Sequence, residues 1–135
     1  MTLEELKQRV SRWRDDYPMA AVVDLLSQKW AGPETRYSTQ EISEELGVPV
    51  EKVMSAFLLL TNDPIPVLSA QWIYVDGDRE FPLPDDTLYQ VLKNEAFQHP
   101  ETGAPVLDYL QTIYRVHTPG SALNALMRGV EMPHG

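Results

Sequence analysis

The feature that most constrains the fold is a pair of helix signals separated by a glycine turn, in residues 38–60. Ser38 and Glu41 have the spacing of a capping box, in which the two side chains satisfy the first free amides of a helix. Gly47 is placed to end this short helix in the left-handed conformation, and Pro49 suits the first turn of a second, longer helix. The segment therefore predicts two helices that share a core across a tight turn.

Two further helices are predicted before this pair. Thr2 and Glu5 form another capping box, and apolar residues recur at helical spacing from there to about Asp16. A second helix, apolar on a broad face, is expected over 18–30. The second of these helices is expected to be well buried.

Two strands are predicted directly after the pair, over 67–75 and 79–82. The first is rich in aromatic and β-branched residues, as strands usually are. Asp76 and Gly77 lie between them, and this dipeptide favours the tight hairpin turn that needs positive φ at both positions. Pro82 has no N–H to donate, which confines the second strand to a sheet edge.

Helices are predicted to dominate the rest of the chain. A helix is expected from Pro84 to about Phe97, an amphipathic helix over 105–117, and a last short helix capped by Ser121. The expected fold class is therefore mainly α with a small β-hairpin. We expect a single domain over 1–128, with a core at 18–82, a C-terminal helical extension at 84–128 and a flexible tail at 129–135.

The order of helix, glycine turn, helix and hairpin, over about residues 18–82, resembles the winged-helix branch of the helix–turn–helix superfamily. The resemblance implies a helical core with the hairpin as its wing, to which the N- and C-terminal helices are additions. Proteins of this superfamily include transcription regulators that bind DNA and modules that dock other proteins. The fold alone therefore does not assign a function.

Charge bears on that choice. The chain carries a net charge of −9, and residues 34–101 hold thirteen acids against four bases, which accounts for the whole imbalance. The second helix of the pair offers only Lys52 as a cation, beside Glu51, whereas a helix that reads DNA presents cationic or amide side chains. An acidic surface repels phosphates. We therefore expect a non-catalytic adaptor or protein–protein interaction module, whose partner has a basic surface.

Two kinds of partner contact are expected. The charged contacts would come from carboxylates of the helix pair and the wing, namely Glu44, Glu45, Glu51, Asp76, Asp78 and Glu80. The apolar anchors would be Leu107 and Tyr109, on a second apolar face of the helix expected at 105–117. Because a helix that is apolar on two sides usually contacts something on each, a homodimer through the C-terminal helices is another use of that face.

A dimeric DNA-binding transcriptional regulator is the first alternative. It would place Lys52 and Ser55 of the second helix, together with Arg9 and Arg12 of the first helix in the chain, on the DNA. The competing interpretation of these arginines is structural, because acids are interspersed with them and the helix then has a salt-bridged outer face.

A small enzyme is the second alternative. His99 and Glu101 place an imidazole and a carboxylate in one loop, but no second pair is spaced to complete three or four metal ligands. The chain has no nucleophile elbow and no glycine-rich phosphate loop. It also has no cysteine, which excludes disulfides and thiolate metal sites. We therefore expect neither a metal nor a cofactor.

The cellular location is predicted from the same composition. The sequence contains no apolar run of the roughly 20 residues that a transmembrane helix needs. Together with the absence of cysteine, this favours a cytoplasmic protein.

Overall fold

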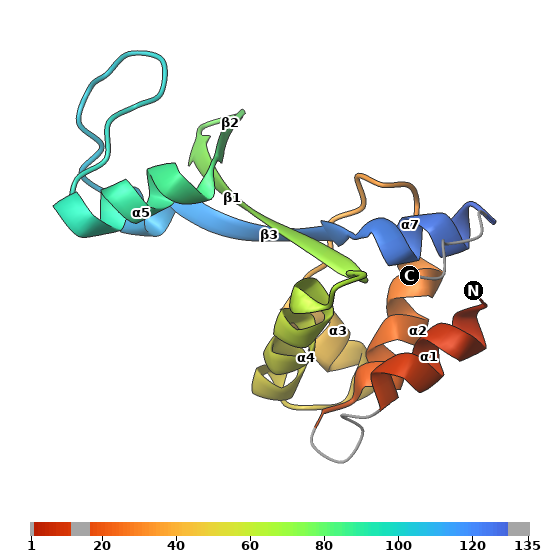
Figure 1. The fold of residues 1–135 in the computed structure, drawn as a ribbon. Coiled ribbons are helices and arrows are strands. Elements are labelled where there is room, and N and C mark those ends of the chain that lie inside the picture. The colour runs from red at the N-terminus through yellow and green to blue at the C-terminus, as the bar shows by residue number, and fades with distance from the viewer. Residues whose placement is uncertain (1, 12–16, 130–135) are drawn as a thin grey trace. The chain divides into compact units, whose positions relative to one another are not determined.

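The computed structural model describes residues 2–11 and 17–129, and this part of the chain contains seven helices and one three-stranded sheet (Figure 1). The chain divides into two compact units. Unit 1 comprises Met1–Ser69 and His117–Gly135, and unit 2 comprises Ala70–Val116. The expected end of the first helix, Arg12 and residues 130–135 of the expected tail lie outside the described residues. No helix in the described part is both long and apolar enough to span a bilayer.

Unit 1 is helical. Its elements are α1 (Leu3–Val10), α2 (Met19–Lys29), α3 (Thr39–Leu46), α4 (Val50–Asn62) and α7 (Ser121–Met127). In the described part, the helices expected before residue 62 are all found. The first residue of α7 is Ser121, and Gly120 occupies the N-cap position that was expected for that serine.

The turn between α3 and α4 forms as the sequence predicts. The Ser38 hydroxyl accepts a hydrogen bond from the Glu41 amide at 3.2 Å, which caps α3. Gly47 ends α3 with φ of 65°, a conformation that costs glycine little. Phe57 of α4 is buried in the core of unit 1, whereas Leu46 at the end of α3 is only partly buried against it.

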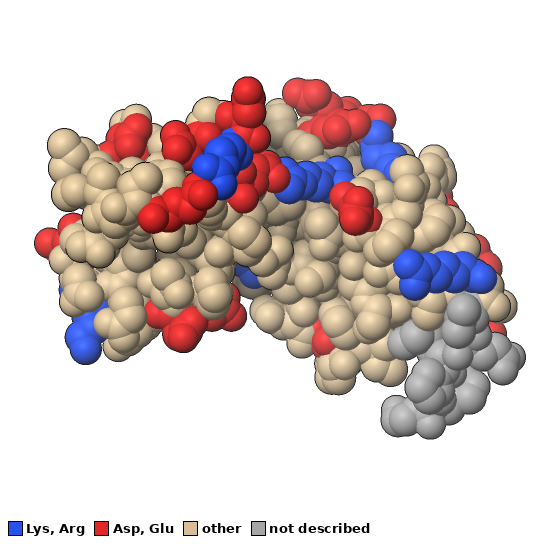
Figure 2. All heavy atoms as spheres, turned by 90° about the horizontal axis from the view of Figure 1, so that it is seen from above, with Lys and Arg blue, Asp and Glu red and all other residues tan. Residues whose placement is uncertain are grey.

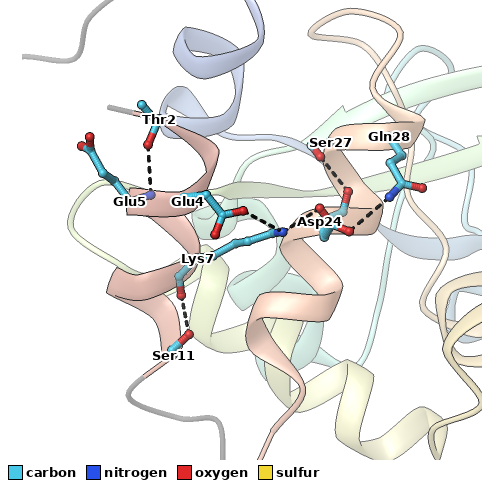
Figure 3. A network of polar contacts seen from close by, with 8 residues as sticks. All are labelled: Thr2, Glu4, Glu5, Lys7, Ser11, Asp24, Ser27 and Gln28. Carbon is cyan, nitrogen blue, oxygen red and sulfur yellow. Dashed lines mark hydrogen bonds and ion pairs between the residues drawn. The ribbon is translucent and has the colours of Figure 1, made fainter.

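Two polar contacts tie α1 to its neighbours. The Lys7 ammonium lies 2.9 Å from the Asp24 carboxylate of α2 and 3.4 Å from Glu4, and these contacts are drawn in Figure 3. The hydrogen bond to Asp24 is the main reason that the pKa of Lys7 is raised. Arg9 forms an ion pair with Asp63, which follows α4. The cations Lys7 and Arg9 of α1 therefore form ion pairs within unit 1.

Two close contacts within unit 1 involve the last turn of α2 and the residue before α7. The Tyr37 hydroxyl donates a hydrogen bond to the Leu26 carbonyl at 2.9 Å, and this carbonyl lies in the last turn of α2. Gly120 lies so close to the Pro66 backbone that a Cβ atom would be 2.5 Å from the Pro66 carbonyl oxygen. Glycine is required at residue 120 by this approach and not by its φ of −83°.

The sheet has the strand order β2-β1-β3, formed by β1 (Leu68–Asp76), β2 (Arg79–Leu83) and β3 (Ile113–Pro119). The predicted hairpin is confirmed, because β1 and β2 pair antiparallel from Asp76 opposite Arg79 to Trp72 opposite Leu83. The strand β2 with its proline lies at an edge, as expected.

The helix predicted over 105–117 is wrong. Only a single turn, α6 (Tyr109–Thr112), forms there, and residues 113–119 are the strand β3. Thr112, Ile113, Tyr114 and Val116 are strand-favouring residues, and pairing with β1 is stronger than the weak helical periodicity. The C-terminal extension is consequently not all helical.

Unit 2 holds the helix α5 (Asp85–Asn94) on a small core. Tyr74, Leu83, Val91 and Phe97 form that core. The helix ends before the expected Phe97, because Glu95 takes the left-handed conformation with φ of 53°. Glycine or asparagine is the usual residue at such a position, so the end of this helix cannot be recognised from the sequence.

Candidate functional site

Unit 2 exposes large apolar side chains around a groove of about 230 Å³. The groove lies within unit 2 and is lined by Trp72, Leu88, Val91, Leu92, Tyr109, Leu110 and Ile113. Leu92 is 59% exposed and Leu110 is 76% exposed. An exposed, contiguous apolar surface of this kind marks an interaction site on many proteins. We therefore take the groove as the candidate functional site.

One wall of the groove is the apolar stripe of α5. Three residues of this stripe have the spacing of one helix face, namely Leu88, Val91 and Leu92. They differ in how deeply they are buried. Val91 is buried in the core of unit 2, whereas Leu92 is mostly exposed. Asp85 lies seven residues before Leu92 and hence on the same side of the helix. The stripe therefore has a buried residue, Val91, an exposed residue, Leu92, and a carboxylate at its start.

The other wall comes from α6 and the start of β3. Tyr109 and Ile113 are partly buried against the unit 2 core, and Leu110 lies between them in sequence and faces solvent. Trp72 of β1 completes the lining. The Arg115 guanidinium lies 5.8 Å from the centre of the Trp72 ring, within the range of a cation–π contact. These elements are short, and the groove depends on the sheet to hold them in place.

The charges of unit 2 are mostly negative. Unit 2 contains eight Asp or Glu residues against three Lys or Arg residues, a formal charge of −5. One of its cations, Arg79, is in an ion pair with Glu101. The hydrogen bond from Arg79 is the main reason that the pKa of Glu101 is lowered. On the face drawn in Figure 2, carboxylates outnumber cationic side chains, and several of the cations lie directly beside carboxylates.

The acids predicted on the helix pair lie on the surface of unit 1. Glu44, Glu45 and Glu51 are all exposed. Glu45 lies 3.0 Å from the Lys29 ammonium, and Glu44 accepts a hydrogen bond from Gln40. These acids therefore lie on the surface of α3 and the first turn of α4, and Glu45 is in an ion pair with Lys29 of α2.

The predicted acids of the hairpin lie on unit 2. Asp76, Asp78 and Glu80 are exposed at the β1–β2 turn. The predicted apolar anchors lie on unit 2 as well, but they differ from each other. Leu107 is 94% exposed, whereas Tyr109 is half-buried and lines the groove.

The residues expected to contact DNA are not gathered on one outward helix face. Arg9 is paired with Asp63, and Lys52 lies 5.4 Å from the centre of the Tyr17 ring. Ser55 is only partly exposed, while its neighbour Met54 is 56% exposed. Leu58, one turn further on, is 49% exposed, so the outward face of α4 presents apolar side chains. Arg12 is outside the described residues.

His99 holds a loop in place. Its Nε2 lies 2.9 Å from the Asp76 carboxylate, and its Nδ1 accepts hydrogen bonds from the amides of Glu101 and Thr102 at 3.1 and 3.3 Å. Since Nδ1 accepts, we place the proton of the neutral ring on Nε2, where it is donated to Asp76. The ring also packs edgewise against Tyr74. Both nitrogens thus have structural partners, and the described residues contain no group of three potential metal ligands.

Comparisons of the chain with models of protein families, with curated proteins and with solved structures find no significant match. The groove, the charge of unit 2 and the outward face of α4 are the observations that bear on function.

Most of the groove was missed by sequence reasoning, which selected only Tyr109 from its lining. Leu88, Val91 and Leu92 look like the core face of an amphipathic helix, and only the small size of unit 2 leaves part of that face uncovered. Leu110 lies in α6, the helical turn that forms within the helix predicted over 105–117. One sequence signal could have indicated the groove. Large apolar residues are dense on each side of the loop at 95–106, and few other residues nearby in the sequence are available to cover them.

Proposed function

We propose that the protein is a non-catalytic interaction module that docks another protein in the apolar groove of unit 2. The observation that carries this proposal is the exposure of Leu92 and Leu110 beside a groove whose lining contains no charged side chain. Buried apolar anchors supply most of the affinity at protein interfaces, while surrounding charges speed encounter and select partners. The acids of unit 2 would have this second role. We keep the cytoplasm as the proposed location.

The proposed resemblance to winged-helix proteins is part of this account. The order α2, α3, α4 and hairpin, with a left-handed glycine between α3 and α4, supports it. In a DNA-binding member, the outward face of the second helix would carry cations. Here Met54 and Leu58 are exposed on α4 instead, which disfavours reading of DNA by this helix.

A peptide-display selection tests this function directly. The full chain is used as bait beside two double variants, one with Leu92→Gln and Leu110→Gln in the groove, and one with Met54→Gln and Leu58→Gln on α4. We expect peptides that are enriched on the wild type and on the α4 variant but not on the groove variant. The absence of any groove-dependent enrichment would contradict the proposal, and a specific shift of duplex DNA at physiological salt would then support the regulator instead.

A further inference from the structure

The size of the groove limits what can occupy it. Its volume of about 230 Å³ is below the roughly 300–1,000 Å³ of typical small-molecule sites. An apolar cavity of about 150 Å³ accommodates one benzene-sized group, so the groove has room for roughly one or two apolar side chains. Trp72 and Tyr109 are the only lining residues with polar side-chain atoms. The occupant is therefore one or two apolar side chains of a larger molecule.

The walls of the groove favour a helix as the donor of these side chains. Leu88 and Leu92 lie one turn apart along α5, so apolar side chains from successive turns of a partner helix can lie beside them. Addition of a partner strand to the sheet is less suitable. Pro82 removes a donor from the β2 edge, and the outer edge of β3 is already bridged at His117 by Tyr37.

The charge around the groove favours cationic residues beside the apolar face of a bound partner helix. Asp85 and Asp86 begin α5, and Asp108 comes directly before α6, so carboxylates stand at the start of both helical walls. Of the three cations of unit 2, Arg79 is paired with Glu101, Arg115 lies over the Trp72 ring, and Lys93 follows Leu92 on α5, so the unit keeps its formal charge of −5. A second copy of the chain would bring another unit 2 of charge −5 to this surface, whereas a cationic partner is attracted to it.

We propose, on the basis of the function proposed above, that the groove of unit 2 binds an amphipathic helix of another protein. The helix inserts apolar side chains from successive turns between α5 and α6, and Lys or Arg residues beside them face Asp85 and Asp108. The apolar insertion supplies affinity, and the carboxylates discriminate between partner helices.

Synthetic helical peptides test this partner class with the full-length chain. The first peptide has leucines on one face and lysines on both flanks, the second has glutamate in place of each lysine, and the third has the composition of the first in a shuffled order. Binding is measured by fluorescence anisotropy of the labelled peptides. We expect the lysine peptide to bind at least about tenfold more tightly than either control.

Three double variants locate the binding. Leu92→Gln with Leu110→Gln should weaken the lysine peptide about tenfold or more, and Met54→Gln with Leu58→Gln on α4 should leave it unchanged. Asp85→Asn with Asp108→Asn should weaken it several-fold at low salt, with a smaller effect as salt is raised, because exposed charges are screened. Circular dichroism of each variant shows whether the fold is retained.

Three results would overturn the inference. These are equal binding of the lysine and glutamate peptides, loss of binding only in the α4 variant, or a dimer in sedimentation equilibrium that the groove variant dissociates. The inference also fails, while the docking function stands, if the display selection enriches groove-dependent peptides that lack cations. If the selection enriches no groove-dependent peptide at all, the docking function fails as well.

Discussion

The two units of this protein use their apolar side chains differently. In the described part of unit 1, sixteen buried residues form one cluster that α1, α2, α3, α4 and α7 all contribute to. In unit 2 the corresponding cluster has four residues, while Tyr89, Leu92, Leu107, Leu110 and Tyr114 are exposed. A unit shorter than about 50 residues has little core to stabilise it, and disulfides, metals or association usually help at this size. The exposed apolar residues of unit 2 are suited to the association proposed above.

The comparison also separates stability from binding. The most buried aromatic ring of unit 1, Phe57, packs edge-on against His117 with ring centres 5.0 Å apart. The leucines of the unit 2 groove have no comparable cover. We therefore expect substitutions in unit 1 to change stability strongly, and substitutions at the rim of the groove to change binding with little effect on stability.

Phe57→Ala should lower the free energy of unfolding of unit 1 by about 3–5 kcal/mol, because it leaves a cavity where a fully buried ring packs. Urea unfolding followed by far-UV circular dichroism measures the loss. A loss below about 1 kcal/mol would mean that α4 does not form the centre of the core. Leu46→Ala should cost less, since Leu46 is only partly buried.

Gly120→Ala should destabilise unit 1 by about 1–3 kcal/mol or more, as overpacking generally does. The added Cβ would be 2.5 Å from the Pro66 carbonyl oxygen, so the backbone has to move. Gly129→Ala serves as a comparison, because a Cβ there has open space and meets only the cost of a positive φ. Thermal unfolding of both variants should rank Gly120→Ala as the less stable, and the reverse order would contradict the close approach at residue 120.

Tyr37 should make unit 1 sensitive to alkaline pH. Burial raises the pKa of Tyr37 to about 12 in the folded protein, from an ordinary value of 10.0. Because the unfolded chain ionises first, the neutral tyrosine's contribution is fully present below pH 10 and is lost as the pH rises towards 12. Tyr37→Phe should remove this pH dependence and cost about 1 kcal/mol at neutral pH, through loss of the hydrogen bond to Leu26.

The measurement is urea unfolding of wild type and Tyr37→Phe at several pH values from 7 upward. A parallel decline of the two proteins between pH 10 and 12 would show that another group is responsible. Tyr114→Phe is a matched control, since Tyr114 is 52% exposed.

Leu92→Gln with Leu110→Gln should change the free energy of unfolding by no more than about 0.5 kcal/mol per site, because both side chains are largely exposed. Urea unfolding measures this change, and hydrogen exchange of α5 amides reports on unit 2 separately. A loss of several kcal/mol would show that these leucines belong to the core of unit 2 and that the groove is structural.

The sequence predicts the helices of unit 1 and the β1–β2 hairpin of unit 2 well, because their signals are local. The capping serine at residue 38 and the glycine at residue 47 act on their own helix, and the Asp76–Gly77 dipeptide acts on its own hairpin. Strand β3 was missed because its partner β1 is distant in sequence, and the pairing between them makes this segment a strand and not a helix. The end of α5 was missed because Glu95 adopts a conformation that glutamate rarely takes.

The candidate site was predicted less well than the fold. The acids of the helix pair and the hairpin are exposed, and Tyr109, which was expected as an apolar anchor, lines the groove, but the groove itself was not predicted. Whether Leu92 is core or surface depends on how many residues of unit 2 are available to cover it. This number follows from the division into two units, which no local pattern in the sequence records.

The central claim is that unit 2, and not the outward face of α4, receives the partner. NMR of the methyl-labelled full chain, titrated with a peptide enriched in the display selection, tests it most directly. The account predicts shifts of the methyl signals of Leu88, Leu92, Leu110 and Ile113, with Met54 and Leu58 unchanged. Shifts confined to Met54 and Leu58 would contradict it and would place the docking surface on α4.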